Sequence, residues 1–450
     1  MKKIIMIVFG ILFFNSYAQN IEMEFPHFAG KAYDFIIFQG SSSKTLIQDT
    51  IPKDGKFTLR IPKQYAPYRG MSRWLITGTK EGGGLDMLIP GHDFSVSCKE
   101  ATPNDHNIIY TENKEIPELN TLYKRQQEIF AKHDAMLQAI KSFPKKDKNY
   151  SVFEKEYQNQ LKAYEYFQKE LNQKADYTAN FLRIVNITQG IGTDILDSEE
   201  KRAKNIAHYI AEDLSWEDLY TSGHWAGVIS SWVDIYSIVF DNSEEFSSDF
   251  EKISKKITDT DQYTDFAGRV ASSLNRNGKD NFIKTIAPVV RASGKVRSYE
   301  GSLSVFISGI EGSQAADLEI TTRAKEDKEE SLALKISDLP GKGYHKTLLV
   351  FYQSGCGGCE LLLKELPEKY ESLKSKGVRV IFLSSDKDET VFRNKVKDLP
   401  WKDVYCDYKG MDGINFKNYG VTGTPTMFLI ESSGKIILRS ALLEEIMKKL

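Results

Sequence analysis

The sequence has little that would bind a polyanion or span a bilayer. Its 450 residues carry 60 lysines and arginines against 62 aspartates and glutamates, a formal net charge of −2. This balance provides no strong positive field, so nucleic acid is not an expected partner. No apolar run approaches the roughly 18 residues that a membrane-spanning helix needs, so the mature chain is predicted to have no membrane span.

Cysteine is equally scarce, because only four occur: Cys98, Cys356, Cys359 and Cys406. An exported protein built on a disulfide framework would carry more, so the sequence favours one working pair over structural staples. Cys98 and Cys406 are interpreted as buried, free thiols that act as small hydrophobic residues. A disulfide between these two is the alternative.

The N-terminus has the pattern of a signal peptide over residues 1–18. Lys2-Lys3 is a short basic region, Ile4 to Phe14 an apolar core, and Ser16-Tyr17-Ala18 a small-x-small cleavage site. The alternative is an uncleaved anchor, for which the apolar run is short. We therefore expect cleavage near Ala18 and an exported, periplasmic mature protein.

The chain is longer than one hydrophobic core usually supports, and its pattern changes twice. Residues 19–104 read as short strands between frequent turns, which is typical of a small β-sandwich domain. Asp54-Gly55 in this stretch is a hairpin signal. Residues 105–324 repeat apolar side chains at spacings of three and four, which predicts a helical domain. Residues 325–450 alternate strand and helix, which predicts an α/β domain.

Two further patterns bear on this division. The charged stretch Lys325 to Glu330 is predicted to be a linker before the last domain. The helical region is rich in aromatic residues, for which core packing is favoured over a binding groove: Trp216, Trp225, Trp232 and Tyr236.

The most informative motif is Cys356-Gly357-Gly358-Cys359, which stands where a strand leads into a helix. Lys346 to Tyr352 is an apolar run of buried-strand character, and Glu360 to Lys376 has leucines at helical spacing. A helix N-terminus lowers the pKa of a thiol, so Cys356 is the expected nucleophile. Cys359, most of a turn deeper, would resolve the mixed disulfide. This arrangement is the one that thiol–disulfide exchange requires.

Other uses of Cys-x-x-Cys are less well supported. Structural zinc needs four ligands, and the sequence has neither a second cysteine pair nor two histidines spaced as zinc ligands. A purely structural disulfide is the other alternative. Because the zinc ligands are missing, no metal is expected. No Gly-x-Gly-x-x-Gly run follows a strand, so no nicotinamide or flavin cofactor is expected either.

A second motif, Gly420 to Thr426 (GVTGTPT), stands directly before an apolar strand at Met427 to Ile430. With the dithiol, it makes the segment Lys346 to Ile437 resemble the thioredoxin superfamily. The resemblance is to exported TlpA-like thiol–disulfide oxidoreductases of Bacteroidetes type. Tyr419-Gly420-Val421 and Gly434-Lys435-Ile436 also fit that pattern.

The resemblance implies a four- or five-stranded sheet with helices on both faces. It also implies that Pro425 is cis and packs beside the Cys356 sulfur, and that the backbone of Thr424 docks an extended substrate segment. Protein disulfides would be the substrates, in cell redox homeostasis. An external electron donor, expected in the membrane, would recharge the Cys356–Cys359 pair, and the direction of exchange stays open.

Two residues depart from the family pattern. Family members carry a tryptophan immediately before the first cysteine, where this chain has Gly355. Thioredoxins also place a buried aspartate six residues before that cysteine, where this chain has Val350. Glu360, Asp386 or a water molecule would have to assist proton transfer instead. The departures concern rate and specificity more than the class of reaction.

Two other functions stay open. Peroxiredoxins share this fold, but the residues Leu349 to Gly355 (LVFYQSG) lack the Pro and Thr that precede a peroxidatic cysteine. The alternative from another class is a non-catalytic binding or scaffold protein with a vestigial redox domain. In that case the strand-rich and helical regions would hold the partner.

Overall fold

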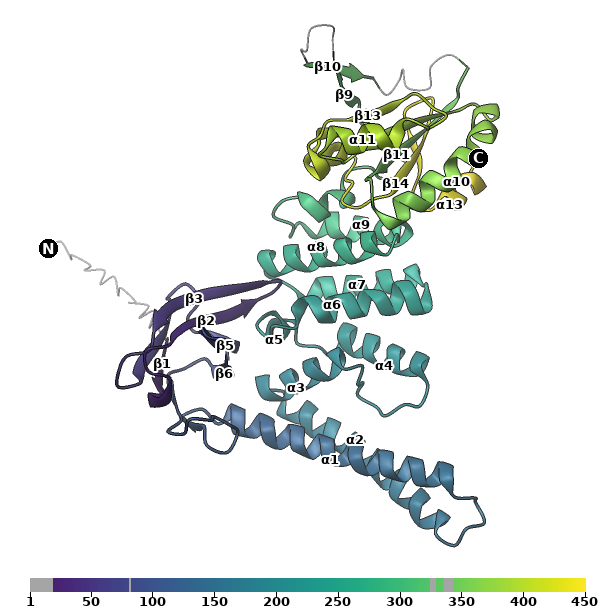
Figure 1. The fold of residues 1–450 in the computed structure, drawn as a ribbon. Coiled ribbons are helices and arrows are strands. Elements are labelled where there is room, and N and C mark those ends of the chain that lie inside the picture. The colour runs from purple at the N-terminus through teal and green to yellow at the C-terminus, as the bar shows by residue number, and fades with distance from the viewer. Residues whose placement is uncertain (1–18, 81, 324–328, 336–342) are drawn as a thin grey trace, which may run out of the picture. The chain divides into compact units, whose positions relative to one another are not determined.

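The computed structural model describes residues 19–80, 82–323, 329–335 and 343–450 (Figure 1). The predicted signal peptide lies outside these residues. The chain divides into two compact units, residues 19–195 with 215–225, and residues 196–214 with 226–450. The helical region is therefore shared between the two units.

The first unit contains two four-stranded sheets, with strand orders β4-β1-β7-β8 and β3-β2-β5-β6. Alternate residues of β2 are buried, and both sheets contribute to one apolar core, for example through Leu59 and Trp74. The bounds are β1 (Gln19–Glu24), β2 (Ala32–Gln39), β3 (Ser42–Thr50), β4 (Lys56–Ile61), β5 (Arg69–Thr77), β6 (Gly84–Pro90), β7 (Phe94–Ser97) and β8 (Ile109–Thr111).

The hairpin predicted at Asp54-Gly55 is wrong. A turn does form there, with Gly55 at φ +73°, but it connects strands of different sheets, because β3 pairs with β2 while β4 pairs with β1. The Phe25 N–H donates to the Gly55 carbonyl oxygen at 2.8 Å, and a Cβ on Gly55 would lie 2.4 Å from the Pro26 Cα. Pairing with the distant β1 therefore overrides the local turn signal.

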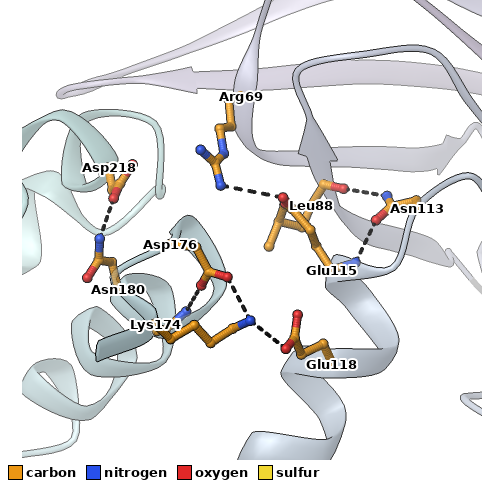
Figure 2. Close-up of polar contacts among 10 residues, drawn as sticks. Arg69, Leu88, Asn113, Glu115, Glu118, Lys174, Asp176, Asn180 and Asp218 are labelled. Carbon is orange, nitrogen blue, oxygen red and sulfur yellow. Dashed lines mark hydrogen bonds and ion pairs between the residues drawn. The ribbon is translucent and has the colours of Figure 1, made fainter. Parts of the chain in front are cut away.

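Among its described residues, the first unit also has four α-helices: α1 (Glu115–Ser142), α2 (Tyr150–Lys174), α3 (Tyr177–Thr188) and α5 (Trp216–Tyr220). Figure 2 shows how α1 begins against the strands. The buried Asn113 amide donates to the Leu88 carbonyl oxygen at 2.8 Å and accepts from the Glu115 N–H at 3.1 Å. Arg69 of β5 pairs with the Glu115 carboxylate at 3.4 Å. The first turn of α1 is thus fixed to β5 and β6.

A second group of polar contacts joins three helices (Figure 2). Asp176 caps α3 by accepting a hydrogen bond from the Ala179 N–H at 2.9 Å, as aspartate commonly does at a helix start. Lys174, at the end of α2, pairs with Asp176 at 2.8 Å and with Glu118 of α1 at 2.5 Å. One lysine therefore ties α1, α2 and α3 together.

The second unit begins with helices and a short π-helical segment, η2. These are α4 (Glu199–Glu212), α6 (Trp225–Asp234), η2 (Ile235–Phe240), α7 (Ser243–Lys256), α8 (Thr260–Arg276), α9 (Asp280–Ser293) and the 3₁₀ helix η3 (Gly301–Phe306). The aromatic side chains for which core packing was predicted are buried: Trp216, Trp225, Trp232 and Tyr236. That prediction is confirmed.

The second unit ends in a five-stranded sheet of order β13-β12-β11-β14-β15, in which β11, β12 and β13 are parallel and β14 and β15 antiparallel to their neighbours. Val350 of β11 packs in an apolar core shared with α10 and α13, whereas Phe351 packs in another core shared with α12. Helices therefore cover both faces of this sheet. The bounds are β11 (Lys346–Tyr352), α10 (Gly357–Ser375), β12 (Val378–Ser384), α11 (Glu389–Val396), β13 (Val404–Cys406), α12 (Ile414–Asn418), β14 (Thr426–Glu431), β15 (Ile436–Ser440) and α13 (Leu443–Lys448).

The segment before this sheet differs from the prediction of a linker. Strands β9 (Leu318–Arg323) and β10 (Glu329–Leu334) pair antiparallel, so Glu329 and Glu330 lie in a strand, whereas residues 325–328 are outside the described ranges. Leu318 and Ile320 of β9 pack in the same core as Phe351. Apolar burial against the sheet therefore starts before the predicted linker.

Candidate active site

The two cysteines stand at the start of α10, directly after the buried strand β11. Cys356 is the N-cap residue, with φ −75° and ψ 125°, and Cys359 lies in the first turn. The Cys356 side chain is partly exposed, whereas Cys359 is 0% exposed. The Gln353 N–H points to the Cys359 sulfur at 3.5 Å. One thiol of the pair is therefore open to a partner and the other is enclosed behind it.

The pKa values of the two thiols move in opposite directions. Partial burial acts to raise the pKa of Cys356, but hydrogen bonds from the Cys359 backbone and thiol, from Thr424 and from the Gly358 N–H outweigh it and lower that pKa. Burial raises the pKa of Cys359 to about 12, and the neighbouring Cys356 sulfur adds to the rise. Cys356 is therefore the more acidic thiol of the pair, while Cys359 stays protonated at neutral pH.

This asymmetry predicts selective alkylation of the native, reduced protein. At pH 7, iodoacetamide should modify Cys356 well before Cys359, because only the thiolate reacts. In a pH series, the alkylation rate at Cys356 should reach half its maximum at a pH below the ordinary thiol pKa of about 8–9. The reason is that a lowered pKa produces thiolate at lower pH. Peptide mass mapping over a pH series measures both rates. Equal modification of the two cysteines in the native state would contradict the assignment.

The Thr424–Pro425 peptide bond is cis and stands immediately before β14, the neighbour of β11 in the sheet. The Cys356 thiol donates to the Thr424 carbonyl oxygen at 3.2 Å. A Cβ on Gly358 would lie 3.0 Å from Pro425 Cδ, whereas a Cβ on Gly357 would meet nothing within 4 Å. Gly358 therefore lets Pro425 pack against the helix start, a reason for this glycine that the sequence did not reveal.

Two carboxylates hold the loop that leads into Cys356. Asp386, 5% exposed at the end of β12, accepts hydrogen bonds from the Ser354 N–H at 2.9 Å and from the Ser354 hydroxyl at 2.6 Å. Glu360 accepts from the Gly355 N–H at 3.0 Å and pairs with Lys395 of α11. Asp386 and Glu360, the two carboxylates considered for proton transfer in the sequence analysis, thus both position this loop.

The two departures from the family pattern have local structural consequences. Gly355 adopts φ +78°, a left-handed conformation that strongly favours glycine over tryptophan. Val350 is fully buried in the apolar core that also contains Cys359. The surroundings of the Cys359 thiol are therefore apolar at the position where thioredoxins carry their aspartate.

The remaining cysteines stand apart from this pair. Cys406, at the end of the edge strand β13, is half-buried, so the prediction that it is buried is wrong; an edge strand leaves one side uncovered. Its thiol lies 3.1 Å from the Asp386 carbonyl oxygen, and burial raises its pKa to about 11. Cys98 is buried, and all four cysteines are free thiols. Among the described residues, no three His, Cys, Asp or Glu side chains gather as a metal site would require.

Strand β11, the dithiol at the start of α10 and the cis-proline turn before β14 place a Cys-x-x-Cys pair at a strand-to-helix junction, an arrangement similar to that of thioredoxin-like proteins. Residues 343–436 match the thioredoxin-like family. The chain is 35% identical over 108 residues to the thiol-disulfide oxidoreductase ResA of Bacillus thuringiensis subsp. konkukian (strain 97-27), across 24% of this chain and 60% of that protein. It is 32% identical over 92 residues to nucleoredoxin of Homo sapiens, across 20% of this chain and 21% of that protein.

Solved structures resemble the chain in part. A thiol-disulfide oxidoreductase from Bacteroides fragilis NCTC 9343 is 24% identical and covers 31% of this chain and 100% of its own, with a TM-score of 0.26. A thioredoxin-like protein from Bacteroides caccae ATCC 43185 is 19% identical and covers 56% of this chain and 94% of its own, with a TM-score of 0.37. Because these TM-scores are low, the similarity to the thioredoxin-like family rests on the sequence matches.

The matches confirm that the C-terminal region resembles the thioredoxin superfamily and its thiol–disulfide oxidoreductases. They concern that region alone, and the chain spans 60% of the length of the first curated relatives that it matches.

Proposed function

We propose that the protein is an exported thiol–disulfide oxidoreductase that exchanges disulfides with protein substrates in cell redox homeostasis. One observation carries the proposal: Cys356 is partly exposed with a lowered pKa, and Cys359 is fully buried with a raised pKa. The first half of exchange needs an accessible thiolate, and the second half needs a thiol held directly behind it.

In the reducing direction, the Cys356 thiolate attacks one sulfur of the substrate disulfide, and the other substrate sulfur leaves as a thiolate. Cys359 then gives up its proton and attacks the Cys356 sulfur. This frees the second substrate thiol and leaves a Cys356–Cys359 disulfide. Two electrons have passed to the substrate, so an external donor must return two. The oxidising direction is the same sequence in reverse.

Thr424 is the proposed docking residue for the substrate backbone. Its carbonyl oxygen lies 3.2 Å from the Cys356 sulfur. An extended segment that forms main-chain hydrogen bonds at Thr424 would therefore bring its own disulfide to Cys356, as strand addition does in other peptide-binding domains. Pro425, the next residue, has no N–H and cannot donate a main-chain hydrogen bond to the substrate. The main-chain contact is therefore left to Thr424.

Export and architecture are part of the proposal. The basic, apolar and small-residue pattern of residues 1–18 supports a signal peptide cleaved near Ala18 and a periplasmic location. Within the described ranges, no helix combines the length and apolar character that crossing a membrane demands. We also propose that the two four-stranded sheets are the layers of a β-sandwich and that the chain has three domains, near 19–104, 105–324 and 325–450. Strand β8 would belong to the first of these and strand β9 to the last.

Single-turnover exchange tests this function. Fully reduced protein, mixed with a peptide disulfide at pH 7, should react at least about tenfold faster than reduced glutathione at equal concentration, because thiolate fraction and docking both contribute. The reaction is followed by thiol alkylation and mass measurement. A rate no higher than that of glutathione would instead favour the non-catalytic scaffold.

A further inference from the structure

A groove of about 830 Å³ lies within the second unit, between its helices and the five-stranded sheet domain. One wall comes from α8 and the segment around η3, and the other from the 3₁₀ helix η5 (Gly410–Asp412), α12 and the loop before the cis-proline. Its volume falls in the range of about 300–1,000 Å³ that is usual for ligand sites. The lining includes Ser272, Tyr299, Met411, Phe416, Val421 and Thr422.

Polar contacts close to the groove join the helices of the second unit to the sheet domain. Arg439 of β15 pairs with Asp280 at the start of α9 at 2.7 Å, and the two side chains are only 5% and 14% exposed. Arg439 also donates to the Gly420 carbonyl oxygen at 3.3 Å. On the other side, the Asn275 amide of α8 donates to the Thr422 hydroxyl. The groove is therefore formed before any partner binds.

The groove adjoins the proposed exchange site along the chain. Thr422 stands two residues before Thr424, whose carbonyl oxygen contacts the Cys356 thiol. Even a fully extended chain rises only about 3.3 Å per residue, so the groove begins no more than about 7 Å along the chain from that docking point. A polypeptide bound at Thr424 would reach it within a few residues of its own cysteine.

We propose that this groove, here called the junction groove, binds the segment of a polypeptide substrate that flanks the reacting cysteine; this rests on the exchange activity proposed above. Its lining includes the apolar, largely buried Phe416 and Val421. It also includes the exposed polar residues Ser272, Glu300 and Lys417. A lining that combines apolar and polar residues suits an extended segment, because successive side chains of such a segment point in opposite directions. The helical region thereby selects polypeptide disulfides over small ones.

Three peptides separate this binding from the chemistry. Each carries one cysteine as a mixed disulfide with glutathione. The first peptide has no extension, the second has an N-terminal arm of about five residues, and the third has a C-terminal arm of the same length. Such an arm is about 17 Å long when extended. Apolar and polar residues alternate in both arms. Reduced protein should react about tenfold faster with one of the armed peptides than with the short one, since the junction groove lies on one side of Thr424.

A groove-filling variant then tests the location. Ser272→Trp, on the exposed face of α8, should remove the gain from the arm and leave the rate with the short peptide unchanged, which also shows that the variant is folded. Ser372→Trp, at an exposed position of α10 outside the groove, is the matched control and should keep the full gain.

The outcomes distinguish the two proposals. If neither arm accelerates the reaction, or if Ser272→Trp keeps the gain, the junction groove does not bind substrate, whatever the exchange rate. If wild-type protein reacts with none of the three peptides, the exchange activity itself fails.

Discussion

Replacing Cys359 with alanine is expected to trap a covalent complex with a peptide disulfide at Cys356, and replacing Cys356 with serine is expected to abolish exchange. Without the buried thiol, nothing attacks the mixed disulfide from within, so it accumulates. A serine hydroxyl is not ionised at neutral pH, so the rate of exchange should fall by at least about 10³-fold. Intact-mass measurement under non-reducing conditions counts the trapped complex, and alkylation of released thiols gives the rate.

Cys406→Ser is the matched control for these variants. Cys406 is also partly exposed, but burial raises its pKa to about 11, so its loss should leave exchange at the wild-type rate. Retention of exchange by Cys356→Ser, or trapping at a cysteine other than Cys356 in Cys359→Ala, would show that the nucleophile is assigned wrongly.

Replacing Arg439 with methionine is expected to destabilise the second unit by about 3–5 kcal/mol, because it leaves the Asp280 carboxylate buried without its partner. The arginine also packs over the Phe428 ring, with the guanidinium carbon 5.4 Å from its centre. Replacing both charges, with Arg439→Met and Asp280→Leu together, should recover most of the loss. Urea-induced unfolding of the single and double variants measures the free energies.

An exposed pair provides the comparison. Arg393 and Glu389 of α11 lie 2.7 Å apart, with the arginine side chain 65% exposed. Arg393→Met should cost less than about 1 kcal/mol, as exposed ion pairs usually do. A similar loss for Arg393→Met and Arg439→Met, or a double variant less stable than Arg439→Met alone, would show that the Arg439–Asp280 pair has no special role in joining the helices to the sheet.

Local sequence patterns predicted the active-site scaffold well. The apolar run at Lys346 to Tyr352 is strand β11 with the same bounds, and the apolar strand predicted at Met427 to Ile430 lies within β14. These elements depend on residues close together in the chain, for which periodicity and turn chemistry are sufficient.

Contacts between distant residues could not be predicted in this way. The Asp54-Gly55 turn carried the usual hairpin signal, yet its second strand pairs with β1. Ser354 and Asp386 meet only because β11 and β12 lie side by side with their ends aligned. The pairing of Arg439 with Asp280 arises from the packing of a helix against an edge strand. In each pair, the sequence around one residue contains no pattern that identifies its distant partner.

The most direct test of the central claim is the redox titration of the Cys356–Cys359 pair against glutathione, read by thiol alkylation and peptide mapping. The account predicts one two-electron transition in which both thiols are lost together, at a potential between about −270 and −120 mV. The position within that range would show whether the protein reduces or oxidises its substrates. A pair that stays reduced, or stays oxidised, at every glutathione ratio would contradict the claim that these cysteines are a working exchange site.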